Sequence, residues 1–185
     1  MPTPSQHRWL TRQALSAADV PAGVMDWLFD KSSLTDRLIR LCEDRDSGAF
    51  HVVVLDQSVS EPYPDEREVL AIEQGAALIR QVHLYSGDTA LVYARTVIPE
   101  TTLTGEQRRY AELGDRPLGA MLFKDETMRR EEVMVTRLQP GDAVHRQTGV
   151  ADEDVWGRRS VFYVSEKPLL VSEFFLPALL ELANR

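Results

Sequence analysis

The sequence predicts an α+β fold, in which a single, mostly antiparallel sheet of about six strands has helices at one face or edge. The first observation behind this prediction is that several segments alternate in the manner of strands. The second is a hairpin, because residues 76–85 and 90–98 flank Gly87 and Asp88, which suit a tight turn between antiparallel strands. The third is that helical spacing of apolar residues occurs only in short segments.

The N-terminal region is expected to be helical after a loosely held arm over residues 1–21, which begins polar and without pattern. Residues 22–29 suit a short helix, and Ser32 or Ser33 then suits the N-cap of a second helix. Apolar side chains recur at helical spacing along this second helix, so one side of it should face the core. They are Leu34, Leu38, Leu41 and Cys42, of which Cys42 is expected to be a buried thiol.

The middle of the chain continues with a strand, a loop and a helix. Residues 50–59 are rich in valine and predict a strand, whereas residues 61–68 are charged and proline-rich and predict a loop. Thr104 begins a capping-box pattern with Gln107, and Gly114 suits the position just after a helix. We therefore expect a helix between Thr104 and Gly114.

The last third of the chain begins with a second short helix over residues 115–123, which we interpret with the preceding helix as a lid over a pocket. Residues 127–138 predict a strand, and residues 139–155 a long charged loop in which His145 is exposed to solvent. The remaining predicted elements are a strand ending at Val164, a turn at residues 165–168, a final strand and a short helix within residues 178–185.

The composition describes one globular domain of 185 residues. A net charge of −8 gives no basic surface for nucleic acid, and a single cysteine excludes an internal disulfide, which fits a reducing compartment. The sequence lacks a signal-peptide core and an apolar run of membrane-spanning length. We expect a cytoplasmic monomer without stable membrane insertion. Metal-ligand spacings, Gly-rich phosphate loops and nucleophile elbows are absent from the sequence.

The strand at residues 167–177 contains an unusual charge. Its two alternating faces are both mostly apolar, so we expect it to be buried on both sides. Glu173 lies in one of these apolar rows. A carboxylate removed from water needs a cation, hydrogen bonds or a proton of its own.

Arg80 poses the same problem in the strand at residues 76–85, where its row is otherwise apolar. A guanidinium stays charged, so it needs an anionic or carbonyl partner. Two interpretations are open: Arg80 and Glu173 form a buried salt bridge, or a ligand lies between them and offers a carboxylate to Arg80 and a hydroxyl to Glu173. Arg95 is a second arginine in an apolar row, and it either serves the structure or joins Arg80 at an anionic ligand.

Several segments together resemble the chorismate lyase family. They are DWLFDKSSLT, the arginine of ALIRQVHL, ARTVIP, PLGAMLF, WGRRS and KPLLVSEFFLP, in this order and between residues 25 and 177. WGRRS and the final strand are the most specific of them. The resemblance implies a single cofactor-free domain over residues 1–185, with helical flaps above an internal ligand site.

The family's activity is the elimination of pyruvate from chorismate to give 4-hydroxybenzoate for ubiquinone synthesis. The resemblance implies that Arg80 binds the ring carboxylate and that Glu173 binds the ring hydroxyl. It also implies backbone contacts from Leu34 and Leu118 at the flaps. From its row alone, we predict that Arg95 meets the enolpyruvyl group. The segment between residues 134 and 156 is longer than in compact members of the family.

Two non-catalytic functions are alternatives. Effector-binding domains of some transcription regulators resemble chorismate lyase in fold, but they normally follow a DNA-binding domain. Only about two dozen residues precede the first matched segment here, which is too short for such a domain. The other alternative is a carrier of small aromatic carboxylates that performs no chemistry.

Overall fold

The computed structural model describes residues 7–185, and its centre is an antiparallel sheet that has seven strands within this range. The strand order is β1-β2-β3-β7-β6-β4, and β5 also pairs with β6. The prediction of an α+β fold on one antiparallel sheet is thereby confirmed. The strands are β1 (Phe50–Ser60), β2 (Ala77–Ser86), β3 (Thr89–Pro99), β4 (Arg129–Arg130), β5 (Met134–Leu138), β6 (Val155–Val164) and β7 (Lys167–Phe175).

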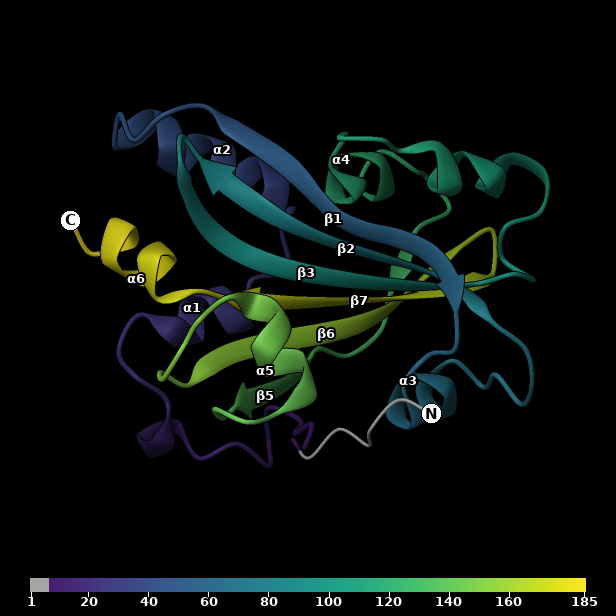
Figure 1. Cartoon of the computed structure of the whole chain (residues 1–185), viewed down its shortest axis with the longest axis horizontal. Coiled ribbons are helices and arrows are strands. Elements are labelled where there is room, and N and C mark those ends of the chain that lie inside the picture. The colour runs from purple at the N-terminus through teal and green to yellow at the C-terminus, as the bar shows by residue number, and fades with distance from the viewer. Residues whose placement is uncertain (1–6) are drawn as a thin grey trace.

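Helices lie on both sides of the sheet, with α2 and α4 on one side and α3 and α5 on the other (Figure 1). The α-helices are α1 (Val24–Leu28), α2 (Leu34–Asp44), α3 (Pro64–Val69), α4 (Leu118–Leu122), α5 (Ala143–Thr148) and α6 (Pro177–Ala183). The 3₁₀ helices are η1 (Ala17–Asp19) and η2 (Gly105–Glu112). The apolar side of α2 is buried as predicted, including Leu38 and the thiol of Cys42.

Two hairpins set the register of the central strands. The predicted hairpin is β2–β3, in which Ser86 pairs with Thr89 across the turn. The second is β6–β7, where Ser165 and Glu166 adopt positive φ angles of 49° and 59° in a two-residue turn. Positive φ at both turn positions matches the right-handed twist of the flanking strands. This register places Arg158 of β6 opposite Glu173 of β7.

Two predicted loops contain helices. Residues 61–68 include α3, because Pro64 suits the first helical position and the Glu66 side chain accepts a hydrogen bond from the Tyr63 backbone N–H at 2.8 Å. Residues 139–155 include α5, which ends at Gly149 with a φ of 79°. The charge and proline content of these two segments predicts loops. Each contains a short helix instead, because one side of the helix is buried against the sheet.

The exposed position predicted for His145 is wrong. Its ring is 1% exposed, and Nε2 lies 2.7 Å from the carbonyl oxygen of Glu153. The helix α5 creates this burial, since it turns Val144, His145 and Thr148 towards the protein. His145 therefore ties the helix to the chain that follows it.

Two further predicted elements differ in detail from those in the structure. The strand expected over residues 127–138 is split into β4 and β5, which pair with different parts of β6. The predicted capping box is absent, because the side chain of Gln107 contacts Ser165 and Lys167 instead, and the segment is a 3₁₀ helix. Gly114 does follow that helix with a positive φ of 57°.

The predicted N-terminal arm is partly outside the described residues, which begin at residue 7. The rest of it contacts the sheet. Leu10 and Val135 exchange two backbone hydrogen bonds of 2.8 Å, and the indole N–H of Trp9 donates to Asp65 at 3.2 Å. From Trp9 onward, the segment is thus held in place more firmly than its sequence suggests.

Candidate active site

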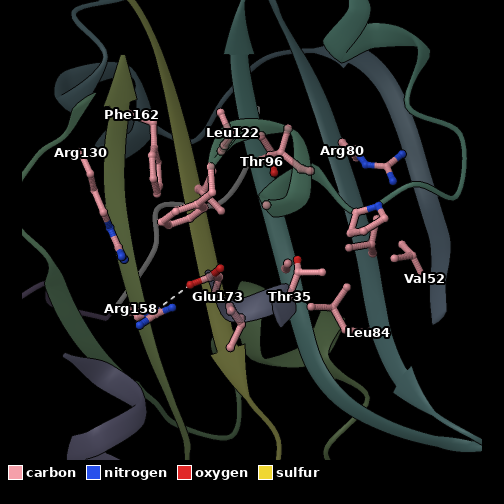
Figure 2. A pocket seen from close by; sticks show the side chains of 18 of the residues that line it. Thr35, Val52, Arg80, Leu84, Thr96, Leu122, Arg130, Arg158, Phe162 and Glu173 are labelled. Carbon is pink, nitrogen blue, oxygen red and sulfur yellow. Dashed lines mark hydrogen bonds and ion pairs between the residues drawn. The ribbon is translucent and has the colours of Figure 1, made fainter. Parts of the chain in front are cut away.

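A cavity of about 50 Å³ lies between the sheet and the helices α2 and α4. Its walls are mostly apolar, and they include Val52, Val82, Leu84, Ala94, Leu122, Phe162 and Val171. Four charged side chains also line it, namely Arg80, Arg130, Arg158 and Glu173 (Figure 2). An apolar cavity with a few polar groups is the usual form of a small-molecule site.

Arg80 is buried without an anionic partner. It is 3% exposed, and its guanidinium donates to the side-chain oxygen of Gln57 at 2.9 Å and to the Arg116 carbonyl at 3.4 Å. None of the ion pairs among residues 7–185 includes Arg80. Burial lowers the pKa of Arg80, and Asp115 partly opposes this. Arg80 can therefore bind an anion that enters the cavity.

Glu173 pairs with Arg158, and the direct pair with Arg80 that one interpretation predicted is not among the ion pairs of the described chain. Arg158 Nε donates to Glu173 Oε2 at 2.6 Å, and the Arg158 side chain is 2% exposed. The same guanidinium also donates to the carbonyl oxygens of Trp27 at 2.8 Å and Asp30 at 2.6 Å. Arg158 thus fixes one oxygen of Glu173 and the end of α1, and Glu173 keeps its other oxygen for a ligand.

Leu34 and Leu118 both line the cavity, and each is the first residue of its helix. Ser33 caps α2 by accepting a hydrogen bond from the Asp36 N–H at 3.3 Å. Backbone N–H groups in a first helical turn have no partner within the helix. The backbone at Leu34 and Leu118 is therefore available to a ligand in the cavity.

The two helices meet closely above the cavity. A Cβ atom on Gly119 of α4 would lie only 2.8 Å from Thr35 Oγ1 of α2. Both residues line the cavity, and Thr35 lies near its centre in Figure 2. Gly119 therefore allows α2 and α4 to lie this close together beside the cavity.

The prediction that Arg95 meets the ligand is not supported, because Arg95 lies on the opposite face of β3 from the cavity-lining residues Ala94 and Thr96. Its guanidinium forms a two-bond ion pair with Glu66 of α3, at 2.7 and 3.0 Å. Burial alone would lower the pKa of Arg95, but the hydrogen bond and charge of Glu66 raise it. Of the two interpretations, the structural one fits.

Sequence reasoning missed Arg130 and Arg158 as cavity residues. Arg158 had a signal, since it belongs to WGRRS and lies as far before the Ser165–Glu166 turn as Glu173 lies after it. Arg130 had no such signal, because β4 has only two residues and so offers no alternating apolar row in which a charge would stand out. Among residues 7–185, no group of three or more His, Cys, Asp or Glu side chains is placed to hold a metal ion.

Comparison with known proteins decides the family. A family model described as "Chorismate lyase" matches residues 3–184. The chain belongs to the chorismate lyase family. A "probable chorismate pyruvate-lyase" from Methylococcus capsulatus is 43% identical over 158 residues, covering 83% of this chain and 94% of that protein. Another from Psychromonas ingrahamii is 40% identical over 159 residues, covering 84% and 83%.

The chorismate lyase family consists of carbon–oxygen lyases, so the prediction of an enzyme of this class is confirmed. Solved structures give only a likeness of fold. The ligand-binding domain of a putative GntR-family regulator from Bordetella bronchiseptica aligns with a TM-score of 0.52 at 13% identity, covering 71% of this chain and 85% of that one. In the part of this chain that the structure describes, no helix is long and apolar enough to cross a membrane.

Proposed function

We propose that this chain eliminates pyruvate from chorismate to give 4-hydroxybenzoate. The observation that carries the proposal is that two polar groups in one mostly apolar cavity can still bind a ligand. They are the Arg80 guanidinium, which has no anionic partner, and the Glu173 oxygen that does not bind Arg158. Chorismate has a ring carboxylate for Arg80 and a ring hydroxyl for Glu173. Membership of the chorismate lyase family supports the same reaction.

The chemistry asks little of the protein beyond positioning. Loss of pyruvate makes the ring aromatic, so the reaction is strongly downhill. In the proposed mechanism, Arg80 and Glu173 hold the ring in a reactive conformer while the bond to the enolpyruvyl ether oxygen breaks. Backbone groups at Leu34 and Leu118 complete the binding of the ring from the closed helices.

Two routes exist for the hydrogen that leaves the ring. In the first, Glu173 accepts it as a proton while the bond between the ring carbon and the ether oxygen breaks, and Arg158 holds the resulting neutral acid in place. The departing enolpyruvate then takes a proton from water at its methylene carbon and becomes pyruvate. In the second, the hydrogen passes within the substrate to the enolpyruvyl methylene, and Glu173 only orients the hydroxyl. Chorismate carrying deuterium at the carbon that bears the hydroxyl separates them. Deuterium in the methyl group of pyruvate supports the second route, whereas its complete loss to water supports the first.

The decisive assay mixes purified protein with chorismate and follows pyruvate and 4-hydroxybenzoate. Equal formation of both products supports the lyase. Tight binding of 4-hydroxybenzoate without turnover would instead favour a carrier or an effector-binding domain. We further propose that the enzyme acts as a cytoplasmic monomer and that its product enters ubiquinone synthesis.

We expect the activity to need no metal ion. The proposed mechanism uses only side-chain and backbone groups of the protein, and no candidate metal cluster occurs among residues 7–185. Dialysis against EDTA should leave the rate of pyruvate formation unchanged. A loss that a divalent cation restores would contradict this expectation.

A further inference from the structure

The cavity contains more positive charge than a single carboxylate ligand requires. Three guanidinium groups, those of Arg80, Arg130 and Arg158, face one carboxylate, that of Glu173, so two positive charges are in excess. Glu173 pairs with Arg158, and under the proposed function the ring carboxylate pairs with Arg80. Arg130 then remains as a cation for which the proposed mechanism has no use.

Arg130 is held by neutral groups alone. Its Nε donates to Ser160 Oγ at 3.0 Å, and Nη1 approaches the Asp30 carbonyl at 3.4 Å. None of the ion pairs among residues 7–185 includes it. Burial and the neighbouring Arg158 lower the pKa of Arg130 to about 10, so it remains a cation at neutral pH. Such a group gains most from an anion that reaches it inside the cavity.

The three groups lie in an order that matches a ligand with two acidic ends. Figure 2 shows Glu173 between Arg80 on one side and Arg130 on the other. The sheet order explains this, because β7 separates β2 and β3 from β6 and β4. A ring whose carboxylate meets Arg80 and whose hydroxyl meets Glu173 can therefore place the substituent next to that hydroxyl on the side of Arg130.

We propose that Arg130 is a further substrate-binding residue, which binds the second carboxylate of the substrate, on the enolpyruvyl group. This rests on the proposed function, because the enolpyruvyl ether stands on the ring carbon beside the hydroxyl. Arg80 then binds what substrate and aromatic product share, whereas Arg130 binds what only the substrate has. The residue thus selects dicarboxylates, and it no longer contacts the ring once pyruvate has separated.

A purely structural role for Arg130 makes a different prediction. The guanidinium lies 5.2 Å from the centre of the Phe162 ring, so its removal could loosen the cavity wall. A loosened wall weakens all ligands alike. Loss of a carboxylate contact weakens only ligands that have the second carboxylate, so two matched ligands separate the roles.

The experiment measures the affinities of two unreactive aromatic ligands by calorimetry. One is 3-carboxymethoxy-4-hydroxybenzoate, and the other is 3-propoxy-4-hydroxybenzoate, which has similar bulk without the second charge. In Arg130→Met, the first should bind about 30-fold more weakly or worse, as for loss of one partner of a buried charge pair, while the second is unchanged. Arg129→Met is the matched control, since the neighbouring Arg129 is about half exposed and pairs with Glu131.

Equal weakening of both ligands in Arg130→Met, or no weakening of the dicarboxylate, would overturn the proposal. Arg130→Gln provides a second neutral variant that can still donate to Ser160, and it should show the same selective loss. The KM for chorismate should rise by a similar factor in both variants. If the wild-type protein does not convert chorismate but the selective loss is observed, the proposed function fails and the Arg130 site stands. If the wild-type protein converts chorismate and Arg130→Met leaves KM unchanged, the proposed function stands and the Arg130 site fails.

Discussion

At the scale of single residues, the buried charges divide by face. On the cavity side of the sheet, Arg80 and Arg130 have only neutral hydrogen-bond partners, and Glu173 pairs with Arg158 through one oxygen. On the other side, the pair of Arg95 with Glu66 satisfies both groups. A satisfied buried pair serves the fold, whereas unsatisfied charges around a cavity are typical of a binding site.

Arg95→Met tests this division. Removing the guanidinium leaves Glu66 buried and unpaired, which should lower the free energy of unfolding by about 3–5 kcal/mol. Urea unfolding measures the loss, and the double variant Arg95→Met/Glu66→Leu should recover much of it because neither charge then remains. The KM for chorismate should be unchanged in folded Arg95→Met, and a large rise in KM would restore Arg95 to the active site.

Glu173→Gln tests the hydroxyl contact. An amide oxygen is a weaker acceptor for a phenol-like hydroxyl than a carboxylate, so affinity for 4-hydroxybenzoate should fall about tenfold. Calorimetry measures this, with the exposed Glu181→Gln on α6 as the control. Unchanged affinity in a folded Glu173→Gln protein would mean that the hydroxyl binds elsewhere.

At the scale of elements, we expect the contact between α2 and α4 to control closure of the cavity. The variant Gly119→Ala places a methyl group 2.8 Å from Thr35 Oγ1, so either the Thr35 side chain or the helices must shift, and we expect the two helices to separate. Release of 4-hydroxybenzoate, measured by stopped-flow displacement, should become faster even though alanine favours the helix itself. The double variant Gly119→Ala/Thr35→Ala restores the space and should restore slow release. Release that is unchanged in Gly119→Ala would show that these helices do not control it.

The sequence predicts the strands and their faces well, because alternation is a local signal that burial enforces. It places Arg80 and Glu173 in apolar rows, and both line the cavity. It does not predict the partners of buried charges, because these depend on contacts between distant segments. Arg95 pairs with Glu66 only because residues 64–69 form a helix, and Pro64 and the surrounding charges made that segment look like a loop.

At the scale of the whole molecule, the charge of the cavity opposes that of the chain. The protein has a net charge of −8, yet positive groups exceed negative ones in the lining of the cavity. An anionic substrate therefore gains attraction only close to the site, where low dielectric strengthens it. Raising the salt concentration should consequently affect kcat/KM little compared with an enzyme whose surface steers its substrate.

Product release is the last step that this arrangement affects. The proposed product keeps both groups that bind Arg80 and Glu173, and binding shared by substrate and product does not speed the chemical step. We expect this shared binding to retain the product beneath α2 and α4, both of which contribute residues to the cavity lining, until these helices move apart. We therefore expect strong inhibition by 4-hydroxybenzoate and a turnover limited by its departure.

Rapid mixing with chorismate should show a burst of about one product per enzyme, followed by a slower steady rate. Gly119→Ala should raise the steady rate and reduce the contrast between the two phases, because we expect its added methyl group to hold the two helices apart. Arg129→Met, on the exposed part of β4, should behave as the wild type. If no burst is seen and added 4-hydroxybenzoate inhibits negligibly, the chemical step limits turnover, and the two helices do not retain the product.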